Sequence, residues 1–146
     1  GIMGSLYSEY GTSSGINREE LFRIQSECIQ HIANRESAIF VGRCADYILR
    51  ERNACLNVFI TATGEDRVER LLECNKIPDA EKYTREEMLD LLEKSDSKRE
   101  TYYNYFTYKQ WGAAASYDLC LNSSLLGIEG CVKIIKDVLY SKGWIK

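Results

Sequence analysis

Apolar residues along the chain switch between helical spacing and short continuous runs. After Asn17, which can cap a helix with Glu20 three residues later, the helical spacing predicts a helix to about Asn34. Three short apolar runs predict strands buried on both faces: residues 38–41 (AIFV), 56–61 (LNVFIT) and 117–122 (YDLCLN). The first run ends at Gly42.

Helical patterns separate and follow these runs. Residues 44–52 predict a short helix, Thr63 can cap a second, and Thr84 with Glu87 forms a capping-box sequence before a long third helix. A C-terminal helix is predicted with Ile128, Val132, Ile135 and Leu139 on its apolar face.

Buried strands alternating with helices indicate a parallel sheet covered on both faces, an α/β fold of the doubly wound type. The 146 residues fit one domain, and the Gly- and Ser-rich segment 1–16 is predicted to be a loop. Ligands of such sheets bind beyond the carboxyl ends of the strands. We therefore expect the functional residues at Gly42 and Arg43 and in the segments after Ala62 and Asn122.

Composition narrows the classes of function. No segment approaches the ~18 consecutive apolar residues of a membrane span, and the first residues resemble neither a signal nor a transit peptide. We expect a cytoplasmic protein with no membrane partner. A net charge of -3 argues against general nucleic-acid binding. Self-association is left open.

The six cysteines are far apart and never form a CxxC pair, so we expect reduced and mostly buried thiols. His31 is the single histidine and lies in a helical pattern without a second ligand at chelating spacing. The sequence therefore predicts no metal site.

Gly42 and Arg43 directly follow a predicted strand. A glycine permits close backbone approach, and an arginine can bind a phosphate with two parallel hydrogen bonds. Asp46 is within one helical turn and could orient Arg43 or accept a hydrogen bond from a base. A strand-ending glycine, a surface arginine and an ordinary ion pair explain the same residues.

Arg67 and Arg70 follow the second strand at a spacing of three, which suits a polyphosphate. A salt-bridged surface is the alternative, because acidic residues surround both arginines: Glu65, Asp66, Glu69 and Glu73.

Lys94, Lys98 and Arg99 precede a dense aromatic run that contains Tyr102, Tyr103, Tyr105, Phe106, Tyr108 and Trp111. Cations beside flat rings can bind phosphate and base together, or single-stranded RNA. A helix that packs its rings on the sheet is the plainer interpretation, and its periodicity fits Tyr102 and Tyr103 better than Tyr105 and Tyr108.

Read together, segments 38–62, 67–71, 94–112 and 117–132 resemble the cytidylate kinase-like family of the P-loop nucleoside monophosphate (NMP) kinases. The resemblance implies a P-loop NMP-kinase-like parallel sheet flanked by helices, with a helical lid. It also implies transfer of the ATP γ-phosphoryl group to a nucleoside monophosphate, with Mg²⁺.

The same resemblance implies roles for single residues. Gly42 and Arg43 match the acceptor-phosphate site, and Asp46 is near the acidic position that reads the base. In cytidylate kinases that acid directly follows the arginine, whereas Cys44 and Ala45 intervene here, so cytosine specificity is not implied. Two groups complete the match: Arg67 and Arg70 at the ATP, and Lys94, Lys98 and Arg99 in the catalytic lid.

The sequence departs from the family at its start. Family members open with a central strand and a glycine-rich phosphate loop, yet no GxxxxGKS or GxxxxGKT run occurs here. We expect a fragment that folds poorly alone; a loop supplied by another chain and a non-catalytic relative are the alternatives. A nucleotide-binding or interaction domain on a kinase scaffold is thus the second functional hypothesis.

Overall fold

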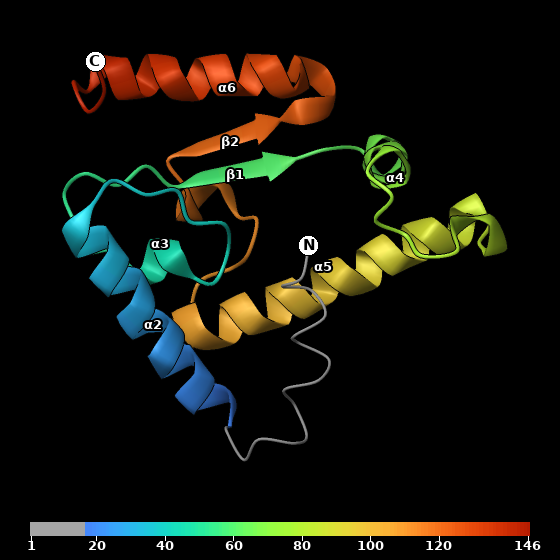
Figure 1. Cartoon of the computed structure of the whole chain (residues 1–146), viewed down its shortest axis with the longest axis horizontal. Helices are drawn as coiled ribbons and strands as arrows, with labels where there is room; N and C mark the ends of the chain where they lie inside the picture. Colours follow the sequence, from blue (N-terminus) through green and yellow to red (C-terminus); the bar gives the residue numbers. More distant parts are fainter. Residues whose placement is uncertain (1–16) are drawn as a thin grey trace. The chain divides into compact units, whose positions relative to one another are not determined.

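A computed structural model describes residues 17–146 (Figure 1). The loop predicted for residues 1–16 lies outside the described residues. The chain divides after Arg52 into two compact units, and each is described by itself. The expectation of a single domain stays a prediction.

The first unit contains helices α2 (Arg18–Arg35) and α3 (Ala45–Ile48), which contact each other. The predicted cap of α2 is confirmed, since the Glu20 amide donates to the Asn17 side chain at 2.8 Å. The Arg52 guanidinium donates to the Asn34 side chain and to the Ala33 carbonyl. The end of the unit is thereby fastened to the end of α2.

The strand predicted at residues 38–41 is wrong. These residues have no regular structure, and the side chains of Ile39 and Val41 are 94% and 89% exposed. A strand needs a neighbour for its backbone N–H and C=O groups, and no strand pairs with this run in the part of the chain that the structure describes.

The helix predicted over residues 44–52 is shorter than expected. Gly42, Arg43 and Cys44 all have left-handed backbone angles, with φ of 70°, 60° and 57°. A right-handed helix cannot include such residues, so α3 begins only at Ala45. Two of the three are not glycine, which makes this turn locally unfavourable.

The second unit contains the sheet. Strands β1 (Val58–Thr61) and β2 (Leu119–Asn122) are parallel, with Thr61 opposite Asn122. Both strands were predicted, although each begins two residues later than its apolar run. The expectation that they are buried on both faces is wrong, since Ile60 and Cys120 are exposed. The described residues thus have a mixed α/β fold with a two-stranded parallel sheet, which is smaller than the sheet expected of the full P-loop fold.

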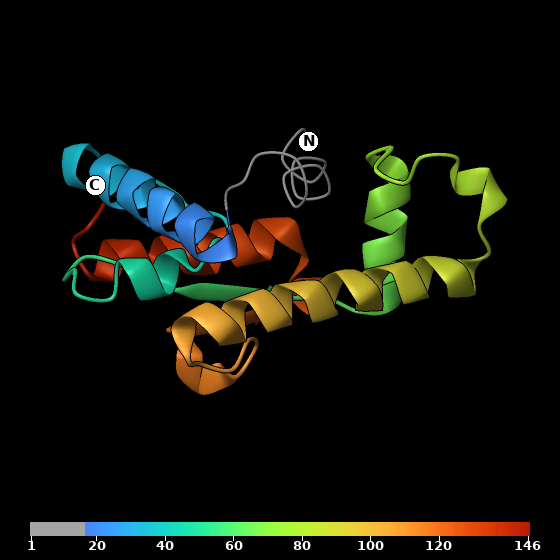
Figure 2. The same ribbon diagram turned by 90° about the horizontal axis from the view of Figure 1, so that it is seen from below.

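Helices α4 (Gly64–Glu73) and α5 (Arg85–Thr107) cross and contact each other (Figure 2). Both predicted caps are present: Thr63 accepts from the Asp66 amide, and Thr84 and Glu87 form a complete capping box. The fully buried Val68 packs with Met88 and Leu92. In the chain, a short 3-10 helix, η1 (Ala80–Lys82), lies between α4 and α5.

Helix α6 (Ser123–Ser141) contacts both strands, and it follows another 3-10 helix, η2 (Ala114–Ser116). Its axis is interrupted at Gly127, whose φ of 69° favours glycine. The predicted apolar face is only partly correct, since Ile135 is half-buried while Ile128 and Val132 are exposed. None of the described helices is long and apolar enough to cross a membrane.

The aromatic run divides between core and surface. Phe59 of β1 packs against Trp111 and Tyr117, with ring centroids 5.3 Å and 4.9 Å apart. Tyr105 and Tyr108 are exposed, in agreement with the poorer fit of their positions to the helical period. Most of these rings therefore serve packing, and a smaller group is left for other contacts.

All six cysteines are free, but the expectation that most are buried is wrong. Only Cys44 and Cys131 are buried, whereas Cys28, Cys74 and Cys120 are exposed. Cys120 is exposed because it occupies a strand that has few covering elements. Desolvation raises the pKa of the Cys44 thiol to about 12, reinforced by Asp46 and opposed by Arg43.

We expect a thiol-reactive dye at pH 8 to label Cys28, Cys74 and Cys120 rapidly and Cys44 only after denaturation. The thiolate is the reactive form, and burial suppresses it at Cys44. Because the folded pKa exceeds the unfolded one, this thiol should also reduce stability as pH rises from about 9 towards about 12. Peptide mapping after timed labelling would measure the order, and rapid labelling of Cys44 in the native protein would contradict it.

Candidate functional site

The carboxyl ends of β1 and β2 are joined by hydrogen bonds to form what we call the carboxyl edge, residues 61–63 and 122–124. The buried Ser123 hydroxyl donates to the Thr61 carbonyl at 3.0 Å. The Thr63 amide donates to the Ser124 hydroxyl at 2.8 Å. Asn122 caps α6 by accepting from the Ser124 and Leu125 amides. This edge is where the sequence predicted ligand binding.

Arg70 reaches the carboxyl edge from α4. One guanidinium nitrogen donates to the Ser123 hydroxyl at 2.9 Å, and the other to the Ser123 carbonyl at 3.2 Å. The positive charge of Arg70 is therefore held next to the ends of both strands. Two of its five N–H groups make these bonds.

Arg67 of α4 forms a two-point ion pair with Asp96 of α5. Its two terminal nitrogens lie 2.7 Å and 2.9 Å from the two Asp96 oxygens. Arg99, one turn further along α5, also donates to Asp96 at 2.8 Å and to the Ser95 hydroxyl at 3.1 Å. One carboxylate thus holds two guanidinium groups, which we call the arginine pair, Arg67 and Arg99.

Pairing of the α4 arginines with the α4 acids, the alternative to polyphosphate binding, is not the arrangement observed for Arg67. Glu65 and Glu69 instead bind Arg85, at the start of α5. The acidic side chains of α4 therefore connect it to α5, and Arg67 depends on a carboxylate 29 residues away.

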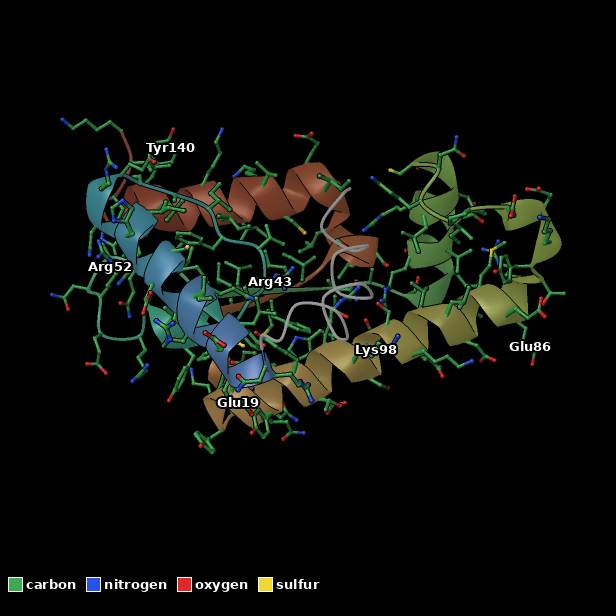
Figure 3. The ribbon with its side chains drawn as sticks, turned by 60° about the horizontal axis from the view of Figure 1, so that its bottom comes forward. Glu19, Arg43, Arg52, Glu86, Lys98 and Tyr140 are labelled. Atoms are coloured by element: carbon green, nitrogen blue, oxygen red, sulfur yellow. The ribbon has the colours of Figure 1, made fainter. Side chains whose placement is uncertain are left out.

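Lys94 and Lys98 are exposed on α5 and line a shallow depression with Asp90, Glu93 and Ser97. Figure 3 shows Lys98 on this helix. Among the predicted lid residues, Arg99 is the one that the structure connects to α4, through Asp96.

Gly42, Arg43 and Asp46 belong to the first unit. Arg43 lies in the left-handed turn before α3, and Asp46 lies in the first turn of that helix (Figure 3). The charges of both residues act on the Cys44 thiol between them in sequence. The local turn therefore presents one guanidinium and one carboxylate within four residues.

Asp96 and Ser123 were not among the candidate residues of the sequence, whereas Asp66 was named only as a possible ion-pair partner of the α4 arginines. Asp96 lies within the basic stretch 94–99, where the cations are the candidates. Its spacing of three from Arg99 is the signal that could have indicated it. A side-chain hydrogen bond with Ser124, and to a smaller extent one with Thr63, holds the pKa of the Asp66 carboxyl below its usual range. Ser123 lies in a segment that the strand-end rule had indicated.

This arrangement suits an anion better than a metal ion. Arg67, Arg70 and Arg99 supply N–H donors in the flat geometry that phosphate oxygens accept. Among the described residues no three His, Cys, Asp or Glu side chains are grouped to hold a metal. Mg²⁺ in phosphoryl-transfer sites is bound largely by substrate phosphates with one or two carboxylates.

Comparisons with known proteins identify the relatives of this chain. A cytidylate kinase of Desulfurococcus amylolyticus is 23% identical over 147 aligned residues, covering 93% of this chain and 76% of that enzyme. The crystal structure of an uncharacterized protein from Eubacterium ventriosum matches with a TM-score of 0.75 and 24% identity, covering 84% of this chain and 74% of that one, which supports the fold. The model of the cytidylate kinase-like family matches residues 2–125. Because that match spans most of the sequence, this chain belongs to the cytidylate kinase-like family.

Proposed function

We propose that this chain is the catalytic domain, or part of it, of a kinase that transfers the ATP γ-phosphoryl group to a nucleoside monophosphate. Family membership supports a nucleotide kinase-like function in general terms. The proposal rests on the position of Arg70, which is bound to Ser123 at the carboxyl edge. The arginine pair lies on α4, the helix of Arg70, and on α5.

On the donor side, Arg67 and Arg70 bind the ATP phosphates. Arg70 is fixed by Ser123 and Arg67 by Asp96, so little side-chain entropy is lost when either meets a ligand. Each retains three of its five N–H donors after the two hydrogen bonds described here.

On the acceptor side, Arg43 binds the phosphate of the monophosphate through two parallel hydrogen bonds. Gly42 allows the backbone to approach that group closely. Asp46 binds an amino or hydroxyl group of the nucleoside. Because Cys44 and Ala45 separate Asp46 from Arg43, the base that Asp46 selects is identified by assaying each monophosphate.

Lys94, Lys98 and Arg99 act as the lid. Phosphoryl transfer depends on positioning and on neutralising charge over the γ-phosphate oxygens. Closure of these cations over the transferring group would supply that charge and exclude water, so that the monophosphate rather than water is the acceptor. In this reaction the γ-phosphorus–oxygen bond to ADP breaks as the bond to the acceptor phosphate oxygen forms.

The proposal requires a phosphate loop, which is not among the residues of this sequence. Mg²⁺, bound with ATP, supplies further neutralisation of the phosphates. The residues of this chain that would hold its ATP partner are Arg67 and Arg70.

The test is a coupled ADP-release assay on the full-length protein, using Mg²⁺-ATP and each of CMP, dCMP, UMP, AMP and GMP. We expect turnover on at least one monophosphate and no comparable ADP release without an acceptor. A protein with a phosphate loop that is inactive on every monophosphate would refute the kinase function.

A non-catalytic nucleotide-binding domain is the second candidate. It is favoured by the internal bonds of Arg67 and Arg70, which give both residues a structural role without a ligand. Calorimetry distinguishes the two, because this candidate requires nucleotide binding with no turnover.

A further inference from the structure

We propose that Asp96 is a positioning residue that fixes the arginine pair for the transferring phosphoryl group and competes with that group for the same two side chains. The inference rests on the proposed kinase function and adds to it a residue that no motif indicated. Asp96 itself need not touch the nucleotide.

The geometry assigns Asp96 a central place. Its two oxygens receive both terminal nitrogens of Arg67 at 2.7 Å and 2.9 Å, and one of them also receives Arg99 at 2.8 Å. The side chains of Arg67 and Asp96 are 29% and 26% exposed, whereas Arg99 is 56% exposed. The carboxylate is thus largely covered while one arginine still faces solvent.

The balance of charge separates this cluster from an ordinary structural ion pair. Two guanidinium groups share one carboxylate, which leaves one net positive charge. The other ion-pair cluster between α4 and α5 has the opposite composition, because Arg85 is shared by Glu65 and Glu69. Both clusters join the same helices, but only the one at Asp96 retains an excess of positive charge for an anion.

Competition follows from the shape of the groups. A carboxylate and a phosphoryl group both accept two parallel hydrogen bonds from one guanidinium. Asp96 occupies that position on Arg67 in the structure. Its negative charge should therefore weaken binding of a polyphosphate while keeping the arginine pair in the orientation that the reaction needs.

The experiment compares Asp96→Asn with the wild-type full encoded protein, using inorganic tripolyphosphate in calorimetry and ATP in steady-state kinetics. We expect Asp96→Asn to bind tripolyphosphate about threefold to tenfold more tightly, because a nearby negative charge is removed. We expect kcat to fall by at least about tenfold, because the arginine pair is no longer held in place. A purely structural residue would not strengthen anion binding.

Two further variants make the result decisive. Asp137→Asn removes the same charge from an exposed pair with Lys133 on α6, and both readouts should stay at the wild-type values. Asp96→Glu keeps the charge but moves the carboxylate by one methylene, so affinity should stay within about twofold while kcat falls. If Asp96→Asn does not fold, Asp96→Glu still tests the positioning role through the fall in kcat.

The two proposals fail separately. Unchanged or weaker tripolyphosphate binding by Asp96→Asn overturns the role of Asp96, whatever the kinase assay gives. For Asp96→Glu, unchanged kcat or a loss of affinity overturns it. Tighter binding by Asp96→Asn in a protein inactive on every monophosphate refutes the kinase function and leaves the control of anion binding by Asp96 standing.

Discussion

Replacement of Arg99 by alanine is expected to lower kcat about 1,000-fold while the dissociation constant for ATP changes much less. A guanidinium that meets the phosphoryl group in the transition state contributes about 10³–10⁵ in rate. Arg99 is the more exposed member of the arginine pair, and Asp96 already fixes its direction. Rapid-quench measurement of the chemical step in the full-length protein would test this expectation.

Arg85→Ala is the matched control, because Arg85 also lies on α5 and also forms ion pairs with carboxylates, those of Glu65 and Glu69. It should leave kcat unchanged. Arg99→Lys keeps the charge but not the flat fork, and should recover only part of the rate. A kcat for Arg99→Ala within about threefold of wild type would exclude a catalytic role for this residue.

Arg43→Ala is expected to raise KM for the nucleoside monophosphate about 100-fold or more. A hydrogen bond to a charged group contributes about 1.5–3 kcal/mol, and Arg43 is proposed to make two. The ATP KM should change little, since the donor phosphates are assigned to Arg67 and Arg70. Initial-rate kinetics at varied concentrations of each substrate would separate these effects.

Arg23→Ala is the control in the first unit, because Arg23 is exposed and pairs only one helical turn away with Glu27. It should leave both KM values unchanged. Equal rises in the ATP and monophosphate KM of Arg43→Ala would argue against an acceptor-specific role. Calorimetry with the monophosphate alone would also detect the loss for a protein that binds without turnover.

Features that depend on neighbouring residues were predicted from the sequence. The caps at Asn17, Thr63 and Thr84 were predicted because each depends on a side chain and an amide three residues apart. The two observed strands were also found, since both are apolar and follow turn residues. The region after each strand was correctly indicated as the place where polar side chains meet.

Partners distant in sequence were not readable. The run at residues 38–41 is as apolar as β1, yet a strand forms only where a neighbouring strand receives its hydrogen bonds. The exposure of Cys120 likewise depends on what covers the sheet and not on its apolar neighbours. For Arg67, the acids next to it in sequence were the alternative to a phosphate ligand, whereas the observed partner is Asp96.

The sequence by itself determined the membership in a kinase family, the N-terminal caps of α2, α4 and α5, the two parallel strands and the cations that are candidates for phosphate binding. These features depend on residue type at short spacing, so each is encoded where it occurs. Only the tertiary structure decided that Ser123 holds Arg70 at the carboxyl edge and that Asp96 joins Arg67 to Arg99. Those bonds connect residues that are 53, 29 and 3 positions apart in sequence. The two bonds between residues far apart in sequence form only because the packed helices and strands bring their atoms within hydrogen-bond distance.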